Sequence, residues 1–139
     1  MKLFMTYNSN QNSILLDSDF VFALQVENDS SHEKALILQE LIIEKNYNLF
    51  YLNIVKQEVA TLISRRITQT QALTTIDLLS NFNEIFITPE TEREVWRLFK
   101  SFSKKNISFV DCANFYFTSK FKFMIASFDT FYPNEFLLK

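Results

Sequence analysis

The stretch that most constrains the fold is Ile14-Leu15-Leu16-Asp17-Ser18-Asp19, a short apolar run that ends in acidic residues. Three apolar residues are too few for a helix and fit a buried strand. Similar runs recur at 49–52, 84–87 and 123–126, and a possible fifth lies at 136–138. The chain therefore presents four or five candidate strands.

The segments between these runs carry helix-start signals. Ser30 with Glu33 three residues later predicts a capping box, and Thr88 before Pro89 predicts a capped helix start. Further helices are expected around 20–24, after the cap residues Asn53 and Ser108, and over 70–79. Strands that alternate with helices indicate βαβ units. We therefore predict one α/β domain over 1–139, with a mostly parallel sheet flanked by helices and a polar leader at 1–13.

The composition narrows the function. Of the 139 residues, 47% are hydrophobic and 22% are charged, as expected for a globular chain. Because glycine is absent, the phosphate loops of nucleotide-binding domains are excluded. One Cys and one His are too few for a structural zinc site, and no apolar run is long enough for a membrane span or a signal peptide. These features predict a cytoplasmic, soluble protein.

Two acids lie where the strands of an open α/β sheet end. Asp17 ends the first strand, and Asp129 follows the fourth within a few residues. Ligands bind outside the carboxyl ends of such strands, where the strand order reverses. If the first and fourth strands are neighbours, the two acids face each other. The alternative is that both are ordinary loop residues.

Glu58 shares a helical stripe with the apolar Ile54, Val55 and Leu62. A carboxylate on such a stripe points inward, which is costly unless it is paired, hydrogen-bonded or bound to a metal. The alternative to a functional role is a salt bridge to a lysine or arginine, such as Arg65 or Arg66.

Asp111 stands three residues after Ser108, which is the position of the acid in a capping box. Its helix leads into the fourth strand, so its first turn is expected at the same edge of the sheet as Asp17 and Asp129. A carboxylate has two oxygens, so capping and a functional role are compatible.

These residues together resemble the PIN domain, and within it the VapC-type toxins of bacterial and archaeal toxin-antitoxin pairs. Ile14 to Asp19 resembles the family's opening hydrophobic-Asp-Thr-Asn, and Gln57-Glu58-Val59 its helix glutamate. Ser108 to Cys112 resembles its Ser-x-x-Asp-Ala segment, and Ala126 to Phe131 its closing Asp-x-x-Phe region. Asp19 replaces the more usual Asn, and the family's common glycines are missing. The resemblance covers about 14–138.

The resemblance implies a ribonuclease that depends on divalent metal and is held inactive by a small antitoxin. Asp17 and Asp111 are then expected to coordinate the ion, with Glu58 and Asp129 completing the site or orienting the attacking water. A cluster of carboxylates suits Mg²⁺ or Mn²⁺ better than zinc. A homodimer is also implied. Because the net charge is −2, positive charge for RNA must be local. Candidate sources are Arg65-Arg66, Lys104-Lys105, Lys120 and Lys122, and the alternative is that each is an ordinary solvated helix end.

Two other classes of protein gather acids at strand ends. A receiver-type signalling domain needs a phosphorylated Asp after its third strand, where this chain has Ile87-Thr88. A non-catalytic PIN-like module that binds RNA or protein would keep the fold and lose the metal. Since all four acids are present, the sequence favours an active enzyme.

Overall fold

The computed structural model describes residues 12–139, so nearly all of the polar leader lies outside the described residues. The elements along the chain are β1 (Ser13–Leu16), α2 (Ser18–Gln25), α3 (His32–Lys45), β2 (Asn48–Leu52), α4 (Asn53–Arg66), α5 (Gln69–Leu79), β3 (Asn83–Ile85), α6 (Pro89–Ser101), α7 (Phe109–Phe121), β4 (Met124–Ala126) and the 3-10 turn η1 (Asn134–Phe136). Among the described residues, no helix is long and apolar enough to cross a membrane.

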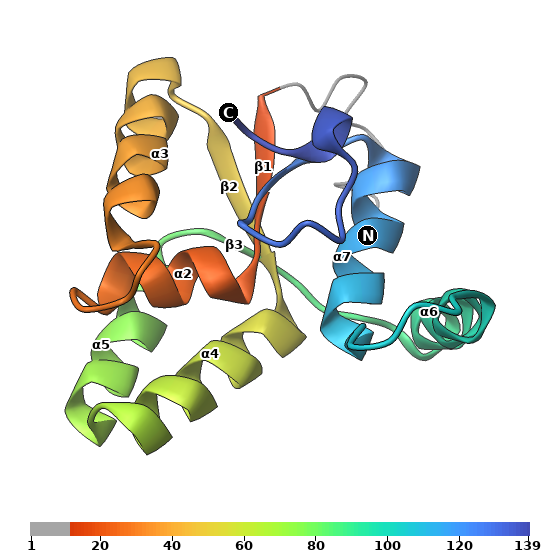
Figure 1. Cartoon of the computed structure of the whole chain (residues 1–139), viewed down its shortest axis with the longest axis horizontal. Coiled ribbons are helices and arrows are strands. Elements are labelled where there is room, and N and C mark those ends of the chain that lie inside the picture. Colours follow the sequence, from red (N-terminus) through yellow and green to blue (C-terminus); the bar gives the residue numbers. More distant parts are fainter. Residues whose placement is uncertain (1–11) are drawn as a thin grey trace.

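The strands form one parallel sheet in the order β3-β2-β1-β4 (Figure 1). The chain adds strands on one side of β1 and then crosses to add β4 on the other side. The strand order therefore reverses between β1 and β4, which is where ligands bind in open parallel sheets. The first and fourth strands are neighbours, so the condition under which Asp17 and Asp129 are expected to face each other is met.

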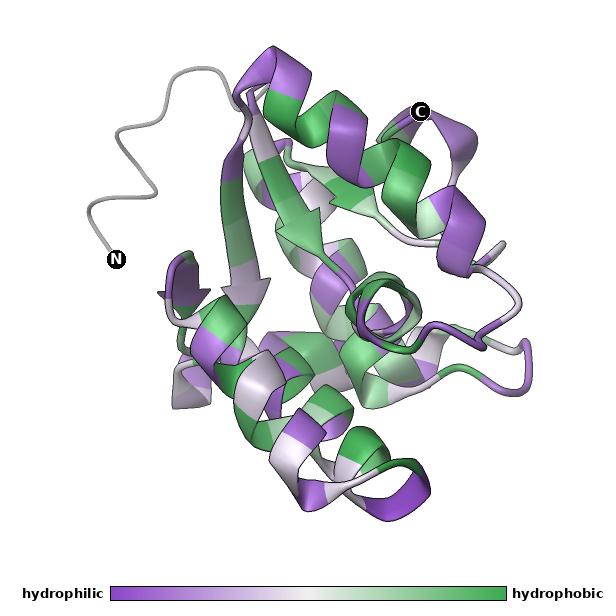
Figure 2. Cartoon of the chain, turned by 90° about the vertical axis from the view of Figure 1, so that its left-hand side faces the viewer, coloured by the Kyte–Doolittle hydropathy of each residue, from purple (hydrophilic) through white to green (hydrophobic). Residues whose placement is uncertain are grey.

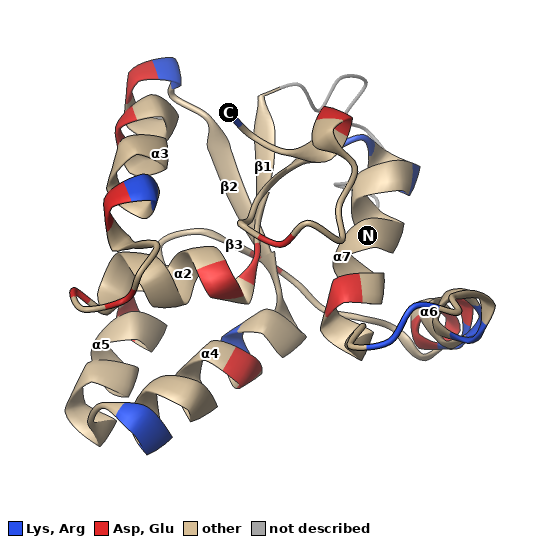
Figure 3. Cartoon of the chain, viewed as in Figure 1, with Lys and Arg blue, Asp and Glu red and all other residues tan. Residues whose placement is uncertain are grey.

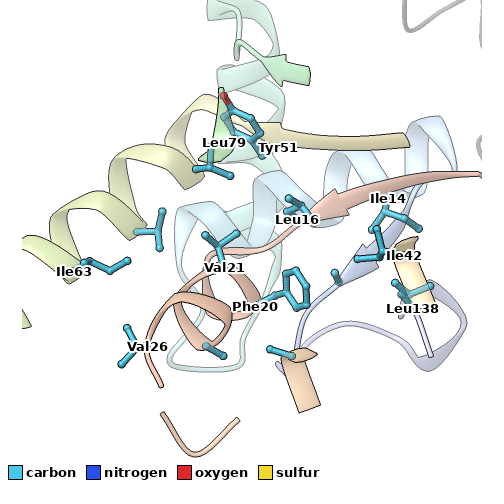
Figure 4. Close-up of a cluster of buried hydrophobic side chains, with 14 of the residues drawn as sticks. Ile14, Leu16, Phe20, Val21, Val26, Ile42, Tyr51, Ile63, Leu79 and Leu138 are labelled. Atoms are coloured by element: carbon cyan, nitrogen blue, oxygen red, sulfur yellow. The ribbon is translucent and has the colours of Figure 1, made fainter. Parts of the chain in front are cut away.

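Both faces of the sheet are covered, so the strands are apolar on both sides. Ile14 and Leu16 face a core built with α2, α3 and α5, whereas Leu15 faces a core built with α6 and α7. Figure 4 shows the first core, in which Phe20 and Val21 of α2 lie beside Leu16. In Figure 2 the long strand ribbons are largely apolar, whereas the helices alternate between apolar and polar residues. These two cores fix α2 and α7 on either side of the end of β1.

Several sequence predictions about local structure are confirmed. Thr88 accepts a hydrogen bond from the backbone N–H of Thr91, and Pro89 begins α6. Ser108 caps α7, and the capping box with Asp111 is complete, as both reciprocal hydrogen bonds are present. The cap at Ser108 fixes the first turn of α7, which lies at the carboxyl edge of the sheet.

The predicted cap at Ser30 is wrong. The helix begins at His32 with Ser31 as its cap residue, and Ser31 makes no side-chain capping bond. Its backbone, at φ −98° and ψ 7°, departs from the extended form that usually aims a hydroxyl at the first turn. Instead, Asp29 accepts a hydrogen bond from the Ser31 N–H.

Asn53 is likewise the first residue of α4 rather than its cap, and its side chain accepts a hydrogen bond from the Ile87 N–H. The possible fifth strand at 136–138 is not a full strand in the structure. Its first residue ends the turn η1, and Leu137 forms one isolated parallel bridge with Ile125.

Candidate active site

Asp17 lies at the end of β1, where its side chain caps α2 by accepting a hydrogen bond from the Ser18 N–H at 2.8 Å. The carboxylate is buried and accepts two further bonds, from Asn114 Nδ2 at 3.0 Å and from Ser127 Oγ at 2.8 Å. Burial raises the pKa of Asp17 well above its ordinary value, and the charge of Asp19 raises it further. Three hydrogen bonds therefore hold the Asp17 carboxylate in place. Its ionised form is high in free energy unless a cation lies nearby.

Asp19, in the first turn of α2, reaches the other side of the same serine. Its Oδ2 accepts hydrogen bonds from Ser127 Oγ at 3.1 Å and from the Phe128 N–H at 2.9 Å. Its Oδ1 is buried without a hydrogen-bond partner. Burial raises the pKa of Asp19 to about 6, against the lowering effect of the hydrogen bond from Phe128.

Ser127 and Asp129 follow β4 and close this side of the site. Ser127 has one hydroxyl proton, so it cannot fully satisfy both Asp17 and Asp19. The Ser127 oxygen accepts a hydrogen bond from the Asp129 N–H, and Asp129 Oδ1 accepts one from the Phe131 N–H. These bonds fold the segment after β4 back toward β1. The result is a compact group of carboxylates that have too few hydrogen-bond donors.

Asp111 approaches from α7. Its Oδ2 accepts a hydrogen bond from the Ser108 N–H at 3.1 Å as part of the capping box. Burial raises the pKa of Asp111, with smaller increases from the charges of Asp129 and Glu58. Asp111 therefore caps the helix, and its charge also raises the pKa of Asp17.

Glu58 projects from α4 toward the start of α2, where its Oε2 accepts a hydrogen bond from Ser18 Oγ at 2.7 Å. The alternative of a salt bridge does not hold, because no ion pair within residues 12–139 joins Glu58 to a lysine or arginine. The carboxylate on the apolar stripe is therefore stabilised by a hydroxyl.

All four predicted acids line one open cleft of about 440 Å³. The residues that line it are Asp17, Ser18, Asp19, Phe22, Asp29, Ser30, Ser31, Glu58, Leu62, Arg66, Ser108, Asp111, Phe128 and Asp129. Figure 3 shows acidic segments of α2, α4 and α7 around this region. A second pocket of about 480 Å³, beside α2 and α3, is lined by apolar residues and by Asn and Gln side chains, and has no acidic residue in its lining.

The donor set is all carboxylate and hydroxyl oxygen, which fits a hard divalent cation. The unpartnered Oδ1 of Asp19 and the raised pKa of Asp17 both indicate a place where positive charge is missing. Yet among the described residues no three His, Cys, Asp or Glu side chains are arranged to hold an ion. Glu58 is turned to Ser18 and Asp111 to Ser108, so joint coordination requires these side chains to rotate.

Three contacts of the site escaped the sequence analysis, namely Ser18, Asn114 and Ser127. Asn114 is fully buried on α7, and its Nδ2 also lies 3.4 Å from the hydroxyl of Tyr132. It is three residues after Asp111, hence on the same helix face, and this spacing is a signal that could have found it. Ser18 and Ser127 flank strand ends and carry no pattern of their own.

The chain is therefore an α/β domain with a parallel sheet and with acids gathered at the switch point of that sheet. No protein-family model matches the chain, and no curated protein matches its sequence. One similar solved structure is VapC20 of Mycobacterium tuberculosis, described as a sarcin-ricin loop cleaving toxin. It has 25% sequence identity and a TM-score of 0.73, and the match covers 84% of this chain and 89% of that one.

A second similar structure is VapBC2 of Rickettsia felis bound to a DNA fragment from its promoter. It has 16% identity and a TM-score of 0.65, covering 91% of this chain and 97% of that one. The predicted PIN-like α/β fold is therefore confirmed, and the structural neighbours of this chain are VapC-type proteins, as the sequence motifs indicate.

Proposed function

We propose that this protein is an endoribonuclease of the VapC type that hydrolyses RNA phosphodiesters with the help of Mg²⁺ or Mn²⁺. The observation that carries the proposal is that Asp17, Glu58, Asp111 and Asp129 line one cleft at the switch point of the sheet. The fold likeness to VapC20, a toxin that cleaves the sarcin-ricin loop, supports RNA as the substrate class.

In this proposal Asp17 and Asp111 hold the ion, and Glu58 and Asp129 complete the site or orient the attacking water. When bound, the ion neutralises the acids and activates the hydrolysis of the phosphodiester. Asn114 and Ser127 keep Asp17 in place through the hydrogen bonds that they donate. The single histidine, His32, does not line the cleft, and its Nδ1 lies 2.7 Å from the carbonyl oxygen of Ala23.

The likeness to VapBC2 supports a place in a toxin-antitoxin pair. We propose a small antitoxin as the partner and a homodimer as the assembly of this chain. RNA as a substrate fits the cytoplasmic location predicted from the sequence.

A non-catalytic PIN-like module that binds RNA or protein is the second candidate. It is favoured by one observation, that the carboxylates of the described residues do not already converge on an ion site. The two candidates differ in whether a divalent ion draws the acids together and starts cleavage.

Cleavage of a labelled RNA panel that includes a sarcin-ricin loop hairpin tests the proposal. The purified protein is expected to cut RNA with Mg²⁺ or Mn²⁺ and to stop when a chelator is added. Asp17→Asn and Asp111→Asn should abolish cleavage, and Glu58→Gln should lower it sharply, whereas Asp77→Asn, an exposed acid on α5, is the control. Cleavage that persists in chelator, or a full rate in Asp111→Asn, would overturn the proposal.

A further inference from the structure

The acidic cleft has a positively charged end. Among the described residues that line it, Arg66 is the one Lys or Arg. Glu58, Leu62 and Arg66 all line the cleft from α4 and are spaced by four residues, so they follow one face of the helix. At about 1.5 Å per residue, Arg66 lies about 12 Å along the helix from Glu58. The cleft therefore runs from a cluster of acids to a guanidinium group.

Arg66 is exposed and is held by an aromatic ring rather than by an acid. Its guanidinium carbon lies 6.0 Å from the centre of the Phe22 ring, which also lines the cleft. Asp29 lies at this cleft too, but its Oδ2 accepts the hydrogen bond from the Ser31 N–H. No ion pair within residues 12–139 involves Arg66, so its charge is not consumed by an internal carboxylate.

A guanidinium that is oriented by a ring and lacks an acidic partner suits a phosphate. Its planar fork donates two parallel hydrogen bonds to phosphate oxygens, which a lysine cannot reproduce. Arg66 lies roughly two helical turns along α4 from Glu58, and no ion pair within residues 12–139 joins the two side chains. The group is thus placed to bind something that spans the cleft.

We propose that Arg66, supported by Phe22, is a subsite that binds an RNA backbone phosphate other than the one that is cleaved. This inference rests on the proposed ribonuclease function and adds the direction in which the strand runs, from the acid cluster along α4. Of the two adjacent arginines in the sequence, only Arg66 lines the cleft. Arg65 is turned about 100° around the helix and lines a shallow pocket with Ala60, Ser64 and Gln69.

The adjacent arginines provide a matched pair of variants. Arg66→Gln and Arg65→Gln remove the same charge from neighbouring exposed positions. Binding of a fluorescent single-stranded RNA is measured by anisotropy, with Asp111→Asn present in each protein so that the RNA is not cut. Cleavage kinetics are measured without that change.

Arg66→Gln is expected to weaken RNA binding about tenfold or more, because a charge-assisted hydrogen bond contributes about 1.5–3 kcal/mol. It should raise KM with little change in kcat, and lower the slope of log affinity against log salt by about 0.7. Arg65→Gln should change binding less than twofold, and Arg66→Lys should fall between wild type and Arg66→Gln, because the charge remains without the fork.

Equal effects of Arg65→Gln and Arg66→Gln, or no effect of either, would overturn the subsite even in an enzyme that cleaves RNA. If the wild type binds RNA with the expected dependence on Arg66 but never cleaves it, the subsite stands and the ribonuclease proposal fails. If the wild type neither binds nor cleaves RNA, both fail.

Discussion

Replacing Asp19 by Asn should stabilise the metal-free protein, and only above about pH 4. Burial raises the pKa of Asp19 from 3.8 to about 6 in the folded state. Between these values the folded protein holds a proton that the unfolded chain has lost, so the free energy of unfolding falls as the pH rises. Above the folded pKa the full cost of the buried charge is present.

The size of the effect follows from the pKa change. At about 1.4 kcal/mol per pH unit, a rise from 3.8 to about 6 corresponds to about 3 kcal/mol of lost stability at pH 8. An asparagine avoids this loss, and its carbonyl oxygen can still accept the hydrogen bond from the Phe128 N–H. Removing the charge of Asp19 also lowers the raised pKa of Asp17, which acts in the same direction.

Urea unfolding in the presence of a chelator, from pH 4 to pH 8, measures the difference between Asp19→Asn and wild type. The stability advantage of the variant should grow by about 2 kcal/mol between pH 4 and pH 7 and then level off. Asp77→Asn on the exposed face of α5 serves as the control. An advantage that does not change with pH, or one that shrinks as the pH rises, would refute the account of Asp19 as a buried carboxylate that lacks a counter-charge.

Three other outcomes are expected. Asn114→Leu should lower cleavage at least tenfold, because it removes the bond of about 1.5–3 kcal/mol that holds Asp17; circular dichroism checks that the variant remains folded. Ser108→Ala and Thr88→Ala each remove a helix cap and should each lower the free energy of unfolding by about 1 kcal/mol. Only Ser108→Ala should also reduce cleavage, because the helix that it caps carries Asp111. Light scattering should report a dimer, and a monomer at high protein concentration would remove that part of the proposal.

The sequence predicted the order of the elements because short apolar runs and cap residues are local signals. Asp17 and Asp129 could be placed at the same edge because parallel strands end at one edge of a sheet, but only the structure shows that β1 and β4 are neighbours. Glu58 could be predicted to point inward from its apolar neighbours. In each case a local pattern, a strand end or a helical periodicity, determined the expected position of the residue.

The hydrogen-bond partners of the acids could not be predicted in the same way. Asn114 and Asp17 are 97 residues apart, and Ser127 and Asp17 are 110 apart, so the contacts depend on the packing of α7 and β4 against β1. The predicted cap at Ser30 is wrong because the choice between adjacent serines depends on backbone angles that the pattern does not encode. The rotamers of the acids depend on local donors such as Ser18, which compete with a metal ion.

Calorimetric titration with Mn²⁺ tests most directly whether the acids act together as one metal site. Wild type and Asp77→Asn should bind the ion alike, whereas Asp17→Asn and Asp111→Asn should bind it at least tenfold more weakly. Unchanged binding in both Asp17→Asn and Asp111→Asn would contradict the account.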